Sequence, residues 1–135
     1  MSTLFTKIIL QQIPSYKIFE DDWTYSFLTK DQIQLGHTLI VPKIEADHFI
    51  DVGEPFYSKV FQNALMISRA IYKATNCTRV GTIIAGWEVP HFHYHLVPMF
   101  SPADLDFAKG KERSREENIL IQTKIVEQIH QQFKK

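Results

Sequence analysis

The spacing of apolar residues predicts helices in three parts of the chain. Residues 3–12 form a short candidate helix, and over residues 54–75 the apolar positions recur at every third or fourth residue, with Pro55 in the first turn. Near the C-terminus, Ser114 followed by Glu117 is a capping-box pattern, which predicts the start of a further helix. This last helix would place on one face Ile119, Val126, Ile129 and Phe133.

Shorter apolar segments between these helices predict strands. They cover residues 17–20, 23–28, 37–41, 80–85 and 92–97. Because the strands outnumber the helices that could cross between parallel neighbours, we expect an α+β fold with a mainly antiparallel five-stranded sheet, a long central helix and a C-terminal helix.

No internal repeat or long linker divides the chain, so we expect residues 1–135 to form a single domain. Residues 101–113 would be a flexible segment of that domain. They would lead into a C-terminal extension whose helix covers residues 114–134.

The 15 basic residues balance the 15 acidic residues, so the formal charge is zero when the six histidines are counted as neutral. A neutral chain lacks the basic excess of a protein dedicated to nucleic acids, and we expect no nucleic-acid partner. No apolar segment approaches the ~20 residues of a membrane span. The single cysteine, Cys77, cannot form an intramolecular disulfide, which favours a reducing compartment. These features predict a soluble cytoplasmic protein without membrane contacts.

Three of the six histidines, His91, His93 and His95, lie in one predicted strand. Alternate residues of a strand share a face, so these imidazoles would point to one side while Phe92 and Tyr94 point into the core. Packing alone does not explain three imidazoles on one face. The row is therefore the main candidate for a functional site.

Three kinds of chemistry could use this row. Imidazole is a common metal ligand, but same-face neighbours lie ~7 Å apart along a strand, and no other ligand pattern such as CxxC accompanies them. A neutral imidazole can also attack phosphorus and form a covalent adduct, while neighbouring histidines orient it or protonate the leaving group. The third use is a pH-sensing interface, which nothing else in the sequence supports.

The segment from residue 85 to residue 98, AGWEVPHFHYHLVP, resembles the signature of the histidine triad superfamily. Upstream, residues 36–43 (GHTLIVPK) resemble a block of its Hint (histidine triad nucleotide-binding) branch in the same order. The resemblance covers about residues 3–100. It implies a homodimer formed through the long central helix, and hydrolysis or transfer at the α-phosphorus of a purine nucleotide with a variable leaving group.

The resemblance also implies roles for individual residues. His93 would be the nucleophile that carries the nucleotidyl adduct, His95 would lie by the α-phosphate and assist the leaving group, and His91 would orient the nucleophile. His37 would be a fourth histidine of the site. The nucleotide-binding residues would be Phe5, Phe27, Leu28, Thr29, Gly86, Glu88 and Val89, with phosphate contacts from the backbone around the last two. No metal or other cofactor is implied.

Some positions depart from the pattern of the branch and leave the substrate open. Thr29 stands where an aspartate usually holds both ribose hydroxyls, while Trp87 and Glu88 replace residues on the leaving-group side. The chain could therefore be a catalytically weak nucleotide-binding module. A metal-dependent enzyme that uses the histidine row is a weaker alternative.

A further departure concerns zinc. Thr3 and Thr6 occupy the places of a cysteine pair found in zinc-carrying relatives, which also use histidines at positions like those of His48 and His91. Because the thiolates are missing, we expect no structural zinc.

Overall fold

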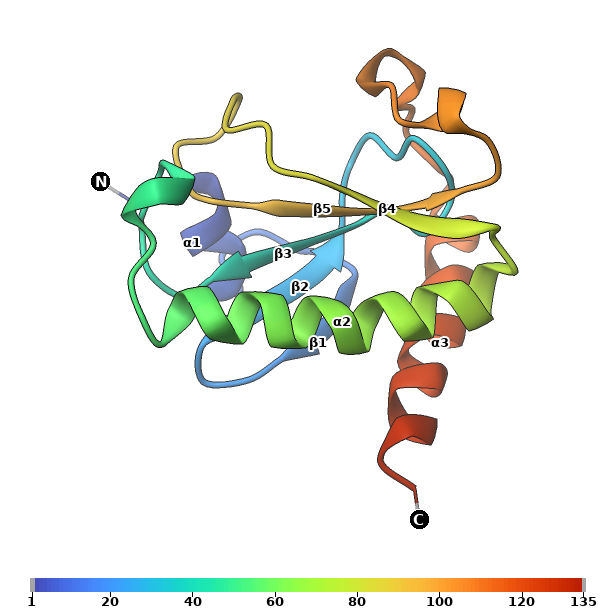
Figure 1. The fold of residues 1–135 in the computed structure, drawn as a ribbon, viewed down its shortest axis with the longest axis horizontal. Helices are drawn as coiled ribbons and strands as arrows, with labels where there is room; N and C mark the ends of the chain where they lie inside the picture. The colour runs from blue at the N-terminus through green and yellow to red at the C-terminus, as the bar shows by residue number, and fades with distance from the viewer. Residues whose placement is uncertain (1, 135) are drawn as a thin grey trace.

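The strands form one antiparallel sheet in the order β1-β2-β3-β5-β4 (Figure 1). In the computed structural model, which describes residues 2–134, they are β1 (Lys17–Glu20), β2 (Thr24–Leu28), β3 (Thr38–Pro42), β4 (Arg79–Ile83) and β5 (Tyr94–Met99). The predicted α+β fold with an antiparallel five-stranded sheet is confirmed. No helix within residues 2–134 is both long and apolar enough to cross a membrane.

Within residues 2–134, three α-helices and three short 3₁₀ turns complete the fold. They are α1 (Leu4–Ile9), α2 (Phe56–Thr75) and α3 (Arg115–Gln132), with η1 (Phe49–Asp51), η2 (Pro102–Asp104) and η3 (Phe107–Lys109). Figure 1 shows α2 running along the sheet and α3 crossing near the C-terminal end of α2.

Helix α2 has the amphipathic pattern that its sequence predicts. Its buried residues, Val60, Ala64, Ile67 and Ile71, recur at three and four positions and pack with Ile40 of β3 in the main core. Burial of each large aliphatic side chain contributes roughly 1.5–3 kcal/mol to folding. The helix ends where Asn76 adopts a left-handed conformation with φ 56°.

The predicted face of α3 is only partly right. The Ser114–Glu117 capping box is present, but Ile119 is 42% exposed and Phe133 is 66% exposed. Since α3 packs against both α2 and β1, it buries a row of residues spaced mostly four apart. The buried residues are Asn118, Ile121, Ile125 and Ile129.

The segment from residue 101 to residue 113 is more ordered than predicted. It contains η2 and η3, and Lys111 pairs with Gln32 in an antiparallel bridge. The Asp104 carboxylate accepts hydrogen bonds from the backbone N–H of Phe100 at 2.7 Å and from the Gln34 side chain at 3.1 Å. These contacts attach the segment to the loop that precedes β3.

Different helices pack on the two faces of the sheet. Helices α2 and α3 pack on one face in the main core, while α1 packs on the other in a smaller cluster. The smaller cluster consists of Phe5, Ile8, Tyr25, Phe27, Leu39 and Val41. Because Leu39 is paired with His95 across β3 and β5, the His95 side chain lies on the α1 face.

Candidate active site

The structure brings the predicted histidines together beside α1, where β3 and β5 are paired. His37, His91, His93 and His95 are all buried, with at most 8% of their surface exposed. Strand β5 begins only at Tyr94, so two of the histidines precede it rather than lying within a strand. The predicted alternation still holds, because Phe92 and Leu96 are buried in the main core on the opposite face.

His37 and His95 form a hydrogen-bonded pair with a determined arrangement of protons. The backbone N–H of Ile33 donates to Nδ1 of His37 at 3.1 Å, so in a neutral ring the hydrogen of His37 lies on Nε2. That Nε2 lies 3.0 Å from Nδ1 of His95 and therefore donates to it. Consequently, neutral His95 carries its hydrogen on Nε2.

The tautomer of His93 is fixed by the backbone. Its Nδ1 lies 2.7 Å from the carbonyl oxygen of His91 and donates to it, because a carbonyl can only accept. In the neutral ring this leaves a lone pair on Nε2. The ring centroid of His93 lies 5.2 Å from that of His95 and 5.1 Å from that of Phe5.

His91 fixes the position of the loop that carries His93. Its Nε2 donates to the carbonyl of Pro42 at 2.8 Å, and its Nδ1 lies 2.7 Å from the hydroxyl of Thr3. Since a neutral His91 has only an acceptor left on Nδ1, the Thr3 hydroxyl donates. The loop is thereby attached to the end of β3 and to the start of α1.

Burial keeps these imidazoles neutral. It lowers the pKa of His37 to about 3, with a further lowering from the charge that His95 would carry. Burial likewise lowers the pKa of His95 to about 4, assisted by His93, and it also lowers the pKa of His91. The tautomers deduced for His37, His91 and His95 are therefore those present at neutral pH.

A cavity of about 600 Å³ opens between α1, the end of β2 and the start of α3, and none of its lining residues is a histidine. Of the predicted nucleotide-binding residues, Phe27, Leu28 and Thr29 line it. Phe5 packs edge-on against both Phe27 and His93, so it connects this cavity to the His93 ring. The other lining residues are Leu4, Ile8, Ile13, Pro14, Ser15, Tyr16, Lys30, Glu112, Arg113 and Asn118.

The remaining predicted binding residues lie in the loop before His91. Gly86 lines a second cavity of about 180 Å³ together with His93, and both Gly86 and Glu88 have a positive φ. The N–H of Val89 donates to the carbonyl of Trp87 at 3.0 Å. This amide, expected to contact phosphate, is therefore already hydrogen-bonded inside the loop, because the loop makes a tight turn there.

Hydrogen bonds replace the zinc ligands at the start of α1. The carboxylate of Glu45 accepts from the Thr6 hydroxyl at 2.6 Å and from the Thr3 backbone N–H at 2.9 Å, which lowers its pKa. The residue beside these threonines is thus Glu45, whereas His48 lines the smaller cavity. In the part of the chain that the structure describes, no group of three or more His, Cys, Asp or Glu side chains could hold a metal ion.

Sequence reasoning missed the residues that support His37 from outside the motifs. The side chain of Gln32 donates to Asn118 at 2.6 Å and accepts from the N–H of Gly36 at 2.9 Å. Arg113 donates to the carbonyl of Gln32 at 3.1 Å. No short-range spacing pattern connects residues so far apart in the chain, so only the tertiary structure could reveal these contacts.

Comparison with known proteins identifies the family. Residues 10–101 match the family model of the HIT domain. The chain belongs to the HIT family. The resemblance of its motifs to the histidine triad superfamily is thus confirmed.

Relatives of this HIT protein include both uncharacterized and named proteins. It is 32% identical over 120 residues to an uncharacterized HIT-like protein of Borreliella burgdorferi, covering 84% of this chain and 86% of that one. It is 34% identical over 96 residues to the adenosine 5′-monophosphoramidase of Saccharomyces cerevisiae, covering 70% and 61%. The adenylylsulfatase of Arabidopsis thaliana is 29% identical over 100 residues, covering 70% and 51%.

Solved structures share the fold of this HIT protein. A hypothetical histidine triad nucleotide-binding protein of Sulfolobus tokodaii superposes with a TM-score of 0.84 at 25% identity, covering 94% of this chain and 91% of that one. A zinc-bound histidine triad protein of Mycobacterium smegmatis superposes with a TM-score of 0.84 at 22% identity, covering 98% and 96%. The second similarity concerns the fold alone.

Proposed function

We propose that this HIT protein hydrolyses or transfers a nucleotidyl group at the α-phosphorus of a purine nucleotide, through a covalent adduct on His93. The observation that carries the proposal is the pair of fixed tautomers. Neutral His93 has a lone pair on Nε2, and the neighbouring His95 has a hydrogen on Nε2. A nucleophile beside a hydrogen-bond donor is the arrangement that a displacement at phosphorus requires.

The larger cavity supports nucleotide binding. Its volume of about 600 Å³ suits a small-molecule ligand, and its lining combines apolar side chains with a few polar groups. The base would lie against Phe27, and the ribose would lie toward the hydroxyl of Thr29. In the second cavity, Gly86 would lie on the leaving-group side of His93.

The proposed reaction proceeds in two steps. The lone pair on His93 Nε2 forms a bond to the α-phosphorus while the bond to the leaving group breaks, and the leaving atom keeps that electron pair. His95 Nε2–H donates a hydrogen bond to the leaving atom as its negative charge develops. Water then attacks the adduct, and the electron pair of the N–P bond returns to His93. Over both steps the leaving group gains a proton and the water loses one.

The leaving group is proposed from named relatives. One relative is an adenosine 5′-monophosphoramidase and another is an adenylylsulfatase. Both substrates join an adenosine phosphate to a small group at phosphorus. We therefore propose nucleoside phosphoramidates as the substrate class, with dinucleoside polyphosphates as the further class that the resemblance of the motifs implies. The reaction needs no cofactor in this scheme.

Adenosine 5′-phosphoramidate tests the proposal. We expect turnover, and a nucleotidyl adduct on His93 detectable by mass spectrometry after rapid quenching. His93→Ala should remove the adduct and lower turnover by roughly a thousandfold or more. His130→Ala, at an exposed position of α3, is the matched control. Wild-type turnover by His93→Ala would contradict the proposal.

A nucleotide-binding module with little turnover is the second candidate. It is favoured by the internal hydrogen bond of the Val89 N–H, which leaves one fewer backbone donor for phosphate. Tight mononucleotide binding without turnover of phosphoramidate, adenylyl sulfate or dinucleoside polyphosphate would identify this function.

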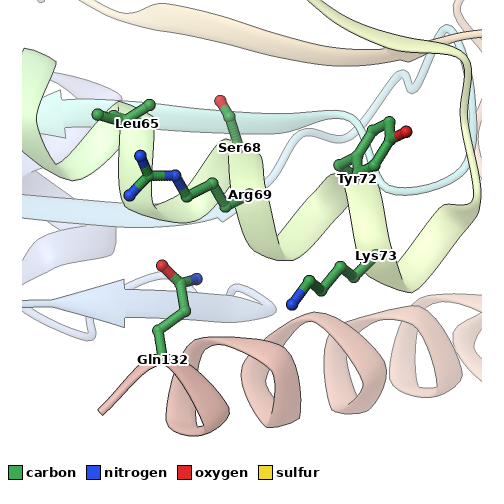
Figure 2. Close-up of a pocket in the computed structure, with 6 residues that line it drawn as sticks. All are labelled: Leu65, Ser68, Arg69, Tyr72, Lys73 and Gln132. Carbon is green, nitrogen blue, oxygen red and sulfur yellow. The ribbon is translucent and has the colours of Figure 1, made fainter.

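We also propose a homodimer. Strand β4 lies at the edge of the sheet, and α2 exposes Leu65 by 55% and Tyr72 by 53%. Figure 2 shows these two side chains and Arg69 on α2, and Gln132 near the end of α3. All four are among the residues that line a groove of about 300 Å³. A second copy placed along α2 would cover the apolar residues and meet the free edge of β4.

The proposed location is the cytoplasm. Cys77 is buried and not part of a disulfide, which suits a reducing compartment.

A further inference from the structure

A single peptide unit connects Arg113 to the histidine pair. Nη2 of Arg113 donates to the carbonyl oxygen of Gln32 at 3.1 Å. The N–H of Ile33, which belongs to the same peptide unit, donates to Nδ1 of His37 at 3.1 Å. His37 Nε2 then donates to Nδ1 of His95 at 3.0 Å. A continuous hydrogen-bond chain therefore runs from a guanidinium to the imidazole beside the nucleophile.

The surrounding contacts hold this peptide unit in one orientation. The backbone N–H of Lys111 also donates to the Gln32 carbonyl, at 3.1 Å. The side-chain amide of Gln32 donates to Asn118 at 2.6 Å, and both side chains are buried. Asn118 in turn donates to the carbonyl of Arg113 at 3.3 Å. Asn118, near the start of α3, thus holds both the Gln32 side chain and the backbone of Arg113 in place.

Arg113 occupies this position at a cost to stability. Its Nε is buried and has no hydrogen-bond partner within the described residues 2–134. A buried unsatisfied donor is rare in folded proteins and destabilises the fold. The guanidinium is held there by Nη2, which donates to the carbonyl oxygens of Gln32 at 3.1 Å and of Ile33 at 3.4 Å.

A positive charge at this carbonyl oxygen would act on the histidine pair through polarisation of the peptide unit. A cation bound to the oxygen of a peptide unit withdraws electron density and makes the N–H of that unit a stronger donor. Here that N–H is directed at His37 Nδ1, and the effect passes along the pair to His95 Nε2–H. The buried imidazoles stay neutral while their terminal N–H becomes a stronger donor toward the substrate.

We propose that Arg113 is a positioning residue that holds the His37–His95 pair in its donor tautomer and strengthens the hydrogen bond from His95 to the leaving group. The proposal rests on the proposed function. Arg113 also lines the larger cavity, so a change in KM alone would not distinguish this role from binding.

Two substrates with the same adenosine part separate the two roles. Adenosine 5′-phosphoramidate has a poor leaving group that needs the hydrogen bond, whereas the 4-nitrophenyl ester of AMP has a leaving group that departs without help. Arg113→Met should lower kcat for the phosphoramidate by roughly tenfold, the scale of one charge-assisted hydrogen bond, and change it little for the ester. Arg113→Lys should recover part of the loss. Arg115→Met, at an exposed position, is the matched control.

If the wild type turns over neither substrate, the proposed function is contradicted. The role of Arg113 can then still be tested by spectroscopy. Imidazole ¹⁵N chemical shifts report the tautomer of His37 and His95. Arg113→Met should increase the population with hydrogen on Nδ1, while Arg115→Met should not. Equal loss on both substrates, no loss on either, or unchanged tautomers in Arg113→Met would overturn the proposal. If Arg113→Met does not fold, Arg113→Gln, which removes the charge but keeps a polar donor, provides the same comparison.

Discussion

The hydroxyl of Thr3 lies 2.7 Å from Nδ1 of His91 and joins the start of α1 to the loop that carries His93. The same oxygen accepts from the N–H of Thr6 and so caps the helix. One side chain therefore serves both the stability of α1 and the geometry of the site, since His91 in turn holds His93 through its carbonyl.

Thr3→Val should lower both the stability of α1 and the activity of the site. It removes the helix cap and leaves a buried imidazole nitrogen without a donor, so we expect a loss of about 2 kcal/mol in the free energy of unfolding. Turnover should also fall, because the loop before His93 loses an anchor. Urea unfolding and kcat measure the two effects. Thr123→Val, on the exposed face of α3, should change neither.

A zinc site should be recoverable at the same place. Thr3→Cys combined with Thr6→Cys would place two thiolates beside His91 and the carboxylate of Glu45. Two thiolates, an imidazole and a carboxylate form a suitable tetrahedral ligand set for zinc. We expect one zinc ion per chain by elemental analysis, and less in the variant that also carries Glu45→Ala. Absence of metal from the double variant would show that the site cannot adopt tetrahedral geometry.

Stability should fall as the pH is lowered from about 6.5 toward 4. His37 and His95 have folded-state pKa values of about 3 and about 4, below the ordinary 6.5 that they regain on unfolding. In that window the unfolded chain binds more protons than the folded chain, so acid favours unfolding. Each histidine contributes a slope of up to roughly 1.4 kcal/mol per pH unit.

Chemical unfolding across that pH range measures the slope. Asp104, whose pKa is held below its ordinary 3.8 by the N–H of Phe100, contributes only at lower pH. His130→Gln, at an exposed position, should keep the slope, whereas His37→Gln should reduce it. A flat profile down to the pKa of His95 would contradict the buried neutral state of the pair.

Thr29→Asp should strengthen the binding of ribonucleotides. A carboxylate at this wall of the cavity offers two charged acceptors in place of one hydroxyl. We expect the KM for adenosine 5′-phosphoramidate to fall by roughly tenfold, the scale of a hydrogen bond to a charged group. The KM for the 2′,3′-dideoxy analogue should not fall. An equal change for both substrates would place the ribose elsewhere.

Leu65→Arg should break the proposed dimer. Leu65 is 55% exposed on α2, where a second copy would bury it, and an unpaired charge in that position is costly. Sedimentation should show that the variant dissociates at a concentration at least about tenfold higher than the wild type does. Leu120→Arg, similarly exposed on α3, is the control. A wild type that stays monomeric would contradict the dimer.

The helices and strands could be predicted from the sequence because they depend on interactions between residues that are close together in the chain. The helices and strands follow from apolar periodicity and from the Ser114 capping box, and the alternation before and within β5 predicted which side the histidines face. The left-handed conformations of Gly36 and Gly86 also match the usual role of glycine. These features depend on neighbours within a few positions, and a sequence pattern records them directly.

The parts that depend on distant contacts were not predictable. The buried face of α3 depends on two packing partners, and its isoleucines fit more than one helical stripe. The link from Arg113 to Gln32 joins two loops about eighty positions apart, and neither residue type signals it. The position of Glu45 beside Thr3 likewise required the path of the chain.

Because Arg113 and Asn118 hold Gln32 in place, the residues needed to build the histidine site extend beyond the end of the family match. The family match stops at residue 101, and all four histidines lie before that point. Yet the peptide unit of Gln32 and Ile33, whose N–H fixes the tautomers of His37 and His95, is held in place by residues 111 to 118. During synthesis, therefore, the motif leaves the ribosome before the residues that complete it. A fragment ending at residue 101 would contain the four histidines of the site but not the residues that hold the Gln32–Ile33 peptide unit against His37.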